Sequence, residues 1–235
     1  MKAILQSGFL ALAVLALAVP ANAGPYEDGK AALDRLDYPT ALKFWWPLAV
    51  QGDVDAQFSL GNMYRDGLGI PQDDAKAVKW WRKAAEQGFA EAQFNLGFRY
   101  EFGLHVPEDK VEAAKLYRKA AEQGNAEGQY RLGMMYWQGN GILRDRTKGL
   151  VLIRNAAENG NPHAQFQLGN LYDLGYGVPQ DFIIAHMWLN LAAAYPGIHS
   201  FVSKQREAVE RNMTPDQVAE AQRMAREWLA KRQQP

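Results

Sequence analysis

The sequence contains no cysteine among its 235 residues. Disulfides, thiolate nucleophiles, cysteine-ligated zinc, iron–sulfur clusters and a lipid-bearing cysteine are therefore all excluded. Charge of one sign is not in excess either, because 26 Lys and Arg residues balance 26 Asp and Glu residues. A balanced charge offers no bulk attraction to nucleic acid or to an anionic membrane surface. We therefore expect no nucleic-acid partner.

The sequence also lacks an apolar run long enough to span a bilayer. Its densest apolar stretch, Phe9–Val19, has eleven residues, whereas a membrane-spanning helix needs about 20. Lys2 precedes this stretch, Pro20 ends it, and Ala21-Asn22-Ala23 has the small-x-small pattern of a signal-peptidase site. We expect residues 1–23 to be a secretory signal peptide that is cleaved after Ala23. The mature protein is then periplasmic or secreted, with no stable membrane insertion; the alternative is an uncleaved anchor.

What the sequence does contain is an internal repeat of 36 residues. Tyrosine, glycine and aspartate follow a Leu-Gly pair at fixed offsets, as Tyr64, Gly67 and Asp73 do in the first copy. The four Leu-Gly pairs begin at Leu60, Leu96, Leu132 and Leu168. A period between about 20 and 50 residues indicates a solenoid or array. We place the four repeats at residues 53–88, 89–124, 125–160 and 161–196.

Each repeat is predicted to form two antiparallel helices. In the first copy, apolar residues at helical spacing predict a helix over residues 54–66. Gly67 and Pro71 end this helix, and Asp73 caps the next one. Because no stretch shows sustained period-2 alternation, we expect an all-α fold, a right-handed α/α solenoid of stacked antiparallel helix pairs.

The glycine of each Leu-Gly pair lies inside a helix, where it costs about 1 kcal/mol relative to alanine. We expect that its missing Cβ lets the second helix of the pair approach closely. Trp45, Trp81 and Trp188 fall at or near core positions of the repeat. Trp137 differs, because the equivalent residues are polar, and it is predicted to be exposed. Those equivalent residues are Arg65, Glu101 and Asp173.

The ends of the array differ from its middle, as the caps of a solenoid must. Residues 24–52 are predicted to form an N-terminal cap helix and a half repeat. Residues 197–235 are predicted to form C-terminal capping helices. Within them, Thr214-Pro215-Asp216-Gln217 has the pattern of a capping box and opens a final helix that runs to about Lys231.

The segment A-Q-F-S-L-G-N-M-Y-R-D-G-L-G-I-P-Q-D-D-A-K-A-V-K-W-W-R-K-A-A-E-Q-G, residues 56–88, resembles the Sel1-like repeat, a longer-looped relative of the tetratricopeptide repeat (TPR). The resemblance spans roughly residues 36–195. His105 replaces the second loop glycine, and we expect it to adopt the left-handed conformation. Gly149 and Ile153 weaken the pattern of the second helix in the third repeat.

The resemblance implies a scaffold that binds a protein or peptide, in envelope signalling, secretion, polysaccharide export or host interaction. Cysteine-rich members of the family have been associated with β-lactam binding, and the absence of cysteine here weakens that implication. An envelope enzyme or a cell-wall or β-lactam-binding protein is the alternative function. A structural spacer without a ligand is a third.

Catalytic motifs are absent from the sequence. The serines of the mature chain, Ser59, Ser200 and Ser203, lie in neither G-x-S-x-G nor S-x-x-K. The histidines show no metal-ligand spacing. We therefore predict no enzyme, no cofactor and no metal site, and we assign Ser59 to a solvated helix position.

The first helices of a stacked array normally line its concave face, where solenoids bind partners. Positions that vary among the repeats on these helices are therefore the candidate binding residues. They are Ser59, Asn62, Asn95, Phe98, Arg131, Met134, Trp137, Gln167 and Asn170. Phe98, Arg131, Met134 and Trp137 have the aromatic, methionine and arginine character of interfaces. Irregular packing between repeats explains this cluster equally well.

Overall fold

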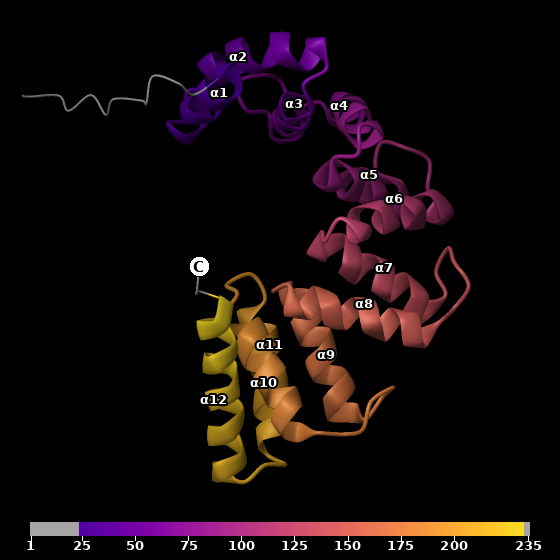
Figure 1. The fold of residues 1–235 in the computed structure, drawn as a ribbon, viewed down its shortest axis with the longest axis vertical. Helices are drawn as coiled ribbons and strands as arrows, with labels where there is room; N and C mark the ends of the chain where they lie inside the picture. The colour runs from indigo at the N-terminus through magenta and orange to yellow at the C-terminus, as the bar shows by residue number, and fades with distance from the viewer. Residues whose placement is uncertain (1–23, 233–235) are drawn as a thin grey trace, which may run out of the picture.

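The computed structural model describes residues 24–232, which contain twelve helices (Figure 1). Their bounds are α1 Pro25–Asp34, α2 Tyr38–Gln51, α3 Val54–Asp66, α4 Asp74–Glu86, α5 Ala90–Phe102, α6 Lys110–Glu122, α7 Ala126–Gln138, α8 Arg146–Glu158, α9 Pro162–Leu174, α10 Phe182–Ala193, α11 His199–Glu210 and α12 Pro215–Arg232. No strand occurs in this range, so the predicted all-α fold is confirmed. The predicted signal peptide lies outside the described residues. None of the helices within residues 24–232 is long and apolar enough to cross a membrane.

The helices stack as a curved array. Helices α3 and α4, α5 and α6, α7 and α8, and α9 and α10 pack in pairs, and each second helix also packs on the first helix of the next element. The ribbon follows an open arc from α1 and α2 to α11 and α12 (Figure 1). The predicted solenoid of helix pairs is therefore confirmed.

In every helix pair, a glycine ends the first helix and an aspartate caps the second; α3 and α4 are the first example. Helix α3 ends at Gly67, whose φ of 67° is left-handed and therefore suits glycine. Asp73 caps α4 by accepting a hydrogen bond from the backbone N–H of Lys76 at 2.9 Å. In the second repeat, His105 has a φ of 61°, which confirms its predicted left-handed conformation.

Close approach of the paired helices explains the glycine inside each first helix. A Cβ on Gly61 would lie 2.5 Å from Cδ1 of Trp81, a separation that real atoms do not reach. Helix α8 forms in full despite Gly149, which the sequence pattern left weak. A Cβ on Gly149 would lie 2.8 Å from the carbonyl oxygen of Gly133. The missing side chains therefore let the backbones of α7 and α8 approach each other.

The core runs along the array between successive helices. Trp45, Trp81 and Trp188 are only 2%, 1% and 7% exposed, which confirms their predicted core positions. Amide side chains link the two helices within each of the first three repeats, where the amide just after the second helix donates to a buried glutamine of the first helix. The pairs are Gln87 with Gln57 at 2.8 Å, Gln123 with Gln93 at 2.8 Å, and Asn159 with Gln129 at 3.0 Å. These bonds satisfy polar groups that the stacking would otherwise bury unpaired.

The N-terminal end of the array is closed by α1. Tyr26 stacks on Trp45 with ring centres 5.7 Å apart, and Nε1 of Trp45 donates to the carbonyl of Tyr26 at 3.0 Å. Helix α1 thereby covers the core that α2 and α3 would otherwise leave open.

The C-terminal end is closed by α11 and α12, which both pack on α10. Thr214 and Gln217 exchange the two hydrogen bonds of the predicted capping box, at 2.8 and 3.3 Å. Trp228 meets Trp188 edge-on with ring centres 6.1 Å apart. Arg232 donates to the carbonyls of Glu158 and Asn159 at the end of α8. The predicted C-terminal capping helix is therefore confirmed.

Candidate protein-binding surface

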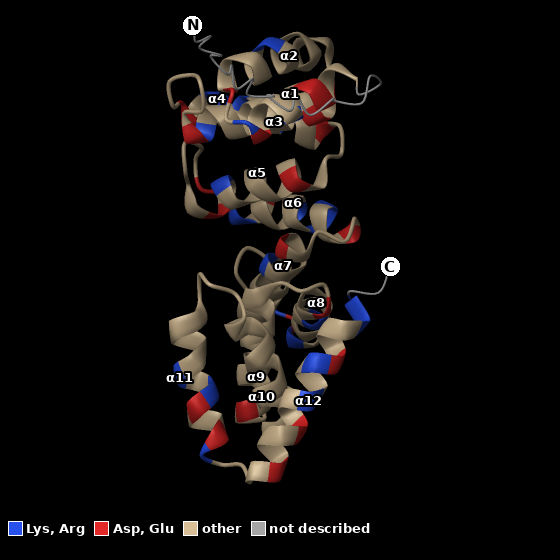
Figure 2. Cartoon of the chain, turned by 90° about the vertical axis from the view of Figure 1, so that its left-hand side faces the viewer, with Lys and Arg blue, Asp and Glu red and all other residues tan. Residues whose placement is uncertain are grey.

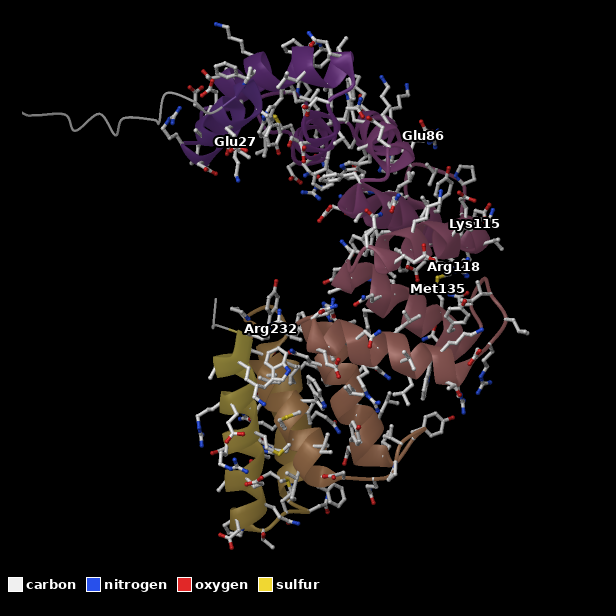
Figure 3. All side chains as sticks on the ribbon, viewed as in Figure 1. Glu27, Glu86, Lys115, Arg118, Met135 and Arg232 are labelled. Atoms are coloured by element: carbon white, nitrogen blue, oxygen red, sulfur yellow. The ribbon has the colours of Figure 1, made fainter. Side chains whose placement is uncertain are left out.

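We call the exposed side of α3, α5, α7 and α9 the first-helix face. The Leu-Gly stripe of each of these helices packs against the second helix of the same pair. Residues on the other sides of the helix therefore do not take part in that packing and are available for the first-helix face. The outer side of the arc is different in character, because it carries exposed charged residues of the second helices such as Glu86 and Lys115 (Figure 3). Two hollows and a filled segment between them make up the first-helix face.

The first hollow lies between α3 and α5 and has a volume of about 250 Å³. Its lining residues are Arg65, Trp81, Phe94, Asn95, Phe98 and Arg99. The guanidinium groups of Arg65 and Arg99 lie 5.8 and 5.3 Å from the centre of the Trp81 ring, within the range of cation–π contact. The hollow therefore combines an aromatic floor with two cations.

Both cations of the first hollow are neutralised within the chain. Arg65 pairs with Asp66 at 2.7 Å, and Arg99 pairs with Asp74 at 3.0 Å. The hydrogen bond from Arg65 lowers the pKa of Asp66 below its usual value. This hollow consequently offers an aromatic and amide surface rather than a free positive charge.

The middle of the face is filled by Arg131. Its guanidinium lies 5.1 Å from the centre of the Phe98 ring and 5.5 Å from that of Phe102. It also faces Glu101, at 3.9 Å, and Glu101 accepts a hydrogen bond from the hydroxyl of Tyr117 at 2.7 Å. Burial, followed by the hydrogen bond to Glu101, raises the pKa of Tyr117 above its usual value, so this hydroxyl stays protonated.

The second hollow lies between α7 and α9 and has a volume of about 420 Å³. Its lining residues are Met134, Trp137, Gln138, Arg144, Arg146, Gln167 and Tyr176. Trp137 and Tyr176 meet edge-on with ring centres 5.6 Å apart. The guanidinium of Arg146 lies 5.5 Å from the Trp137 ring centre and 4.6 Å from that of Tyr176.

A third hollow, of about 420 Å³, lies on the second-helix side between α6 and α8. Its walls include Leu132, Val151 and Leu152. The repeat places Leu152 where α4 has Trp80 and α10 has Trp188. Leu116 of α6 and Leu152 of α8 are thus smaller than the tryptophans at the same register of α4 and α10.

The structure groups most of the predicted binding residues into these hollows. Asn95 and Phe98 line the first hollow, and Met134, Trp137 and Gln167 line the second. Four predicted residues line neither of these two hollows, and one of them, Ser59, lies under Tyr26 of α1. Asn62 accepts a hydrogen bond from Nε1 of Trp81 at 3.2 Å, Arg131 fills the middle segment, and Asn170 is half-buried and lines neither hollow.

Two sequence predictions about exposure are wrong. Trp137 was expected to be exposed, but it is only 9% exposed because Tyr176, in the loop after α9, packs against its ring. Ser59 was expected to be solvated, but it too is only 9% exposed, because Tyr26 of α1 lies over it with its hydroxyl 3.3 Å away. Ser59 is therefore part of the N-terminal cap contact rather than of a free surface.

Sequence reasoning missed Arg144 and Arg146, which lie in the loop before α8 and at its first residue. The prediction considered only positions on the first helices. Comparing the four loops would have found these arginines, since the equivalent pairs are Gln72 and Asp74, Glu108 and Lys110, and Gln180 and Phe182. Within residues 24–232, no three His, Asp or Glu side chains gather closely enough to hold a metal ion.

Comparison with known proteins identifies the family of the 36-residue repeat. A family model described as the Sel1 repeat matches residues 54–89, 90–125, 126–161 and 162–194. A search of proteins with curated functions found no match.

Solved structures show the same architecture. A protective antigen of uropathogenic Escherichia coli with the Sel1-like repeat (SLR) fold is 32% identical over 88% of this chain, with a TM-score of 0.78. The chain spans only 45% of that antigen. A Sel1 repeat protein from Oxalobacter formigenes is 36% identical, over 72% of this chain and 70% of its own, with a TM-score of 0.64. The immunity protein Pa5087 of Pseudomonas aeruginosa shares the fold at 19% identity, over 88% of this chain and 78% of its own, with a TM-score of 0.51. The chain therefore belongs to the Sel1-repeat family.

Proposed function

We propose that the protein is an exported, non-catalytic scaffold of the bacterial envelope that binds a protein or peptide partner through its first-helix face. Sel1-repeat proteins are typically protein-interaction scaffolds, and this chain has the repeats of that family. We further propose that the protein is exported to the envelope and that its binding there is regulatory.

One observation carries the proposal. The residues that pack the repeats recur every 36 positions, whereas the residues of the first-helix face differ from repeat to repeat. That face contains the aromatic first hollow and the cationic second hollow. Partly buried aromatic rings beside arginine are typical of surfaces that anchor a protein partner.

The polar groups in the middle of the face favour binding over catalysis. Glu101 is held by Tyr117 and faces Arg131, so its carboxylate is already engaged by the protein. A general base needs a carboxylate or imidazole within reach of substrate. Labelling by a β-lactam or turnover of peptidoglycan by the pure protein would contradict the non-catalytic part of the proposal.

Export is supported by the sequence of residues 1–23. Helix α1 begins at Pro25, so cleavage after Ala23 leaves every described helix whole. Mass spectrometry of the protein from a periplasmic extract is expected to show an N-terminus at Gly24. An intact N-terminus in a membrane fraction would contradict export with cleavage.

Site-specific photo-crosslinking in living cells tests the binding face. A crosslinking side chain at Asn95 or Gln167, each lining a hollow, is expected to capture the same protein partner. The matched controls are Lys79 and Lys119, which are exposed on the second helices α4 and α6. Equal capture from the control positions, or capture from them alone, would contradict the assignment of the face.

A further inference from the structure

Arg144 and Arg146 distinguish the second hollow from the rest of the first-helix face. Both side chains are exposed and line the hollow. Within residues 24–232, neither lies within 4.0 Å of a carboxylate oxygen. The two positive charges of this hollow are therefore not neutralised by the part of the chain that the structure describes.

Asp145, between the two arginines, is engaged elsewhere. Its carboxylate caps α8 by accepting a hydrogen bond from the backbone N–H of Lys148 at 3.0 Å, and it pairs with the Lys148 ammonium at 3.4 Å. The backbone hydrogen bond lowers the pKa of Asp145 below its usual value. This carboxylate thus stays charged on the helix terminus rather than covering the arginines.

At the equivalent loop positions, the other repeats have either a charged residue that forms an ion pair or no charged residue. In the first repeat, Asp74 pairs with Arg99 at 3.0 Å, and in the second, Lys110 pairs with Glu108 at 3.1 Å. The fourth repeat has Gln180 and Phe182, which carry no charge. The third repeat alone places two cations there, beside a hollow of about 420 Å³.

The aromatic floor holds one of these cations in place. The guanidinium of Arg146 stacks on Tyr176 at 4.6 Å and also lies near Trp137. Stacking uses the face of the guanidinium and leaves its N–H groups at the edge, where they fit the two oxygens of a carboxylate. Met134 supplies an apolar wall, and Gln138 and Gln167 supply amides that can bond to a peptide backbone.

We propose that the second hollow binds an acidic segment of the partner protein, with its carboxylates on Arg144 and Arg146 and an apolar side chain against Met134. This inference rests on the proposed function and specifies its partner chemistry.

A long polyanion fits the surface less well. The cations of the first hollow are paired. Along the helices of residues 24–232, Lys and Arg are interspersed with Asp and Glu and form no continuous basic track in the view of Figure 2. Binding of a nucleic-acid backbone depends on several such cations in a row. A short acidic segment needs only the two that the hollow provides.

Fluorescence anisotropy with two labelled peptides tests the proposal on the mature chain. One probe contains Asp, Glu, Leu and Phe, and the other has Asn and Gln in place of the acids. We expect the acidic probe to bind about ten-fold or more tightly than the amide probe, with affinity that falls as salt rises. Equal binding of both probes, or no saturable binding of the acidic probe at about 1 mM, would overturn the proposal.

Variants localise the binding. The double variant Arg144→Gln/Arg146→Gln is expected to lose about ten-fold or more of the affinity for the acidic probe. The matched control Lys79→Gln/Lys119→Gln removes the same charge from the outer helices and is expected to leave the affinity unchanged. Thermal unfolding followed by circular dichroism checks that both variants are folded. Unchanged binding by the arginine variant would contradict the site.

The outcomes separate this inference from the proposed function. If the partner is captured from Asn95 but the acidic probe does not bind, the scaffold function stands and the acidic-segment proposal is wrong. Binding of the acidic probe without any partner capture at the first-helix face would contradict the scaffold function instead. Tighter binding of a single-stranded DNA probe than of the acidic peptide would identify a polyanion site and overturn the inference.

Discussion

At the residue scale, one position of the repeat shows how the first-helix face is varied without changing the fold. Arg65, Glu101 and Trp137 occupy the same register. Arg65 lies over Trp81, Glu101 accepts a hydrogen bond from Tyr117, and Trp137 meets Tyr176. Each side chain finds a partner in its own part of the face, so the residue at this register changes from arginine to glutamate to tryptophan while the backbone stays the same.

Replacing Tyr117 by Phe is expected to lower the free energy of unfolding by about 1.5–3 kcal/mol, because the charged Glu101 loses its 2.7 Å hydrogen bond. The carboxylate is only 11% exposed and keeps Arg131 at 3.9 Å. Urea unfolding at neutral pH measures the change. Tyr176→Phe is the control, since the Tyr176 hydroxyl makes no hydrogen bond among the described residues and its loss is expected to cost little. Equal costs for the two variants would contradict the role of Tyr117.

His186 on α10 predicts a dependence of stability on pH. The His186 side chain is 1% exposed, and this burial lowers its pKa. Glu210, at 3.6 Å, partly opposes the lowering, whereas Arg206 on α11 lowers the pKa further. The unfolded chain therefore binds a proton more readily than the folded one below about pH 6.5. Stability is expected to fall as the pH decreases from about 6.5 toward the lowered native pKa.

The substitution His186→Gln removes this contribution, so the free energy of unfolding should decrease less steeply between about pH 6.5 and pH 5. Chemical unfolding at a series of pH values measures the slope. His163→Gln, at an exposed position on α9, is the control and is expected to keep the steeper dependence. A slope unchanged by His186→Gln would show that another group causes the acid sensitivity.

At the scale of the element, helix termini were predictable and contacts between elements were not. The bounds of α3, Val54–Asp66, match the prediction because Gly67 ends the helix through its own backbone preference. The exposure of Trp137 depends on Tyr176, and that of Ser59 on Tyr26, each from a segment more than thirty residues away. A sequence pattern places a side chain on its helix, but it does not show what a neighbouring segment lays over it.

The candidate binding surface was also predictable in part. Variable positions on the first helices pointed to Asn95 and Phe98, and to Met134 and Gln167, which line the hollows. The arginines of the second hollow belong to the loop and to the first turn of α8, and only the fold brings them beside α7. The positions of the two hollows could thus be predicted in outline from the sequence, whereas the charge of the second hollow could not.

Helix α8 approaches its partner helix α7 closely at Gly149, and this close approach can be tested. The variant Gly149→Ala is expected to lower the free energy of unfolding by about 1–3 kcal/mol, because the new Cβ would lie 2.8 Å from the carbonyl oxygen of Gly133. That cost outweighs the gain in helix propensity of about 1 kcal/mol. Gly197→Ala is the control, since its nearest side-chain neighbour would be 3.8 Å away. Greater stability of Gly149→Ala would mean that α7 and α8 have room for a methyl group.

At the scale of the whole molecule, each helix packs mainly on its neighbours along the chain, so the two ends of the array are coupled only through the repeats between them. The caps therefore protect the ends to which they are attached. Trp228 on α12 covers Trp188, and Trp46 on α2 lies edge-on to Trp80 at 6.1 Å.

Loss of a cap contact should consequently loosen one end of the array and spare the other. Trp228→Ala is expected to speed amide hydrogen exchange in α9 and α10 by about ten-fold or more while leaving α3 and α4 unchanged. Trp46→Ala, the matched variant at the other end, is expected to affect α2 to α4 only. Exchange that accelerates uniformly along the chain in either variant would contradict local coupling and indicate a single cooperative unit.

The central claim is that the first-helix face binds the partner. Hydrogen exchange measured by mass spectrometry, with and without the partner captured by crosslinking, tests it most directly. We predict slower exchange in α5, α7 and α9 and in the loop at residues 139–145, with α4 and α6 unchanged. Protection confined to α4, α6 and α8, with the first helices unaffected, would contradict the claim and place the partner on the outer side of the array.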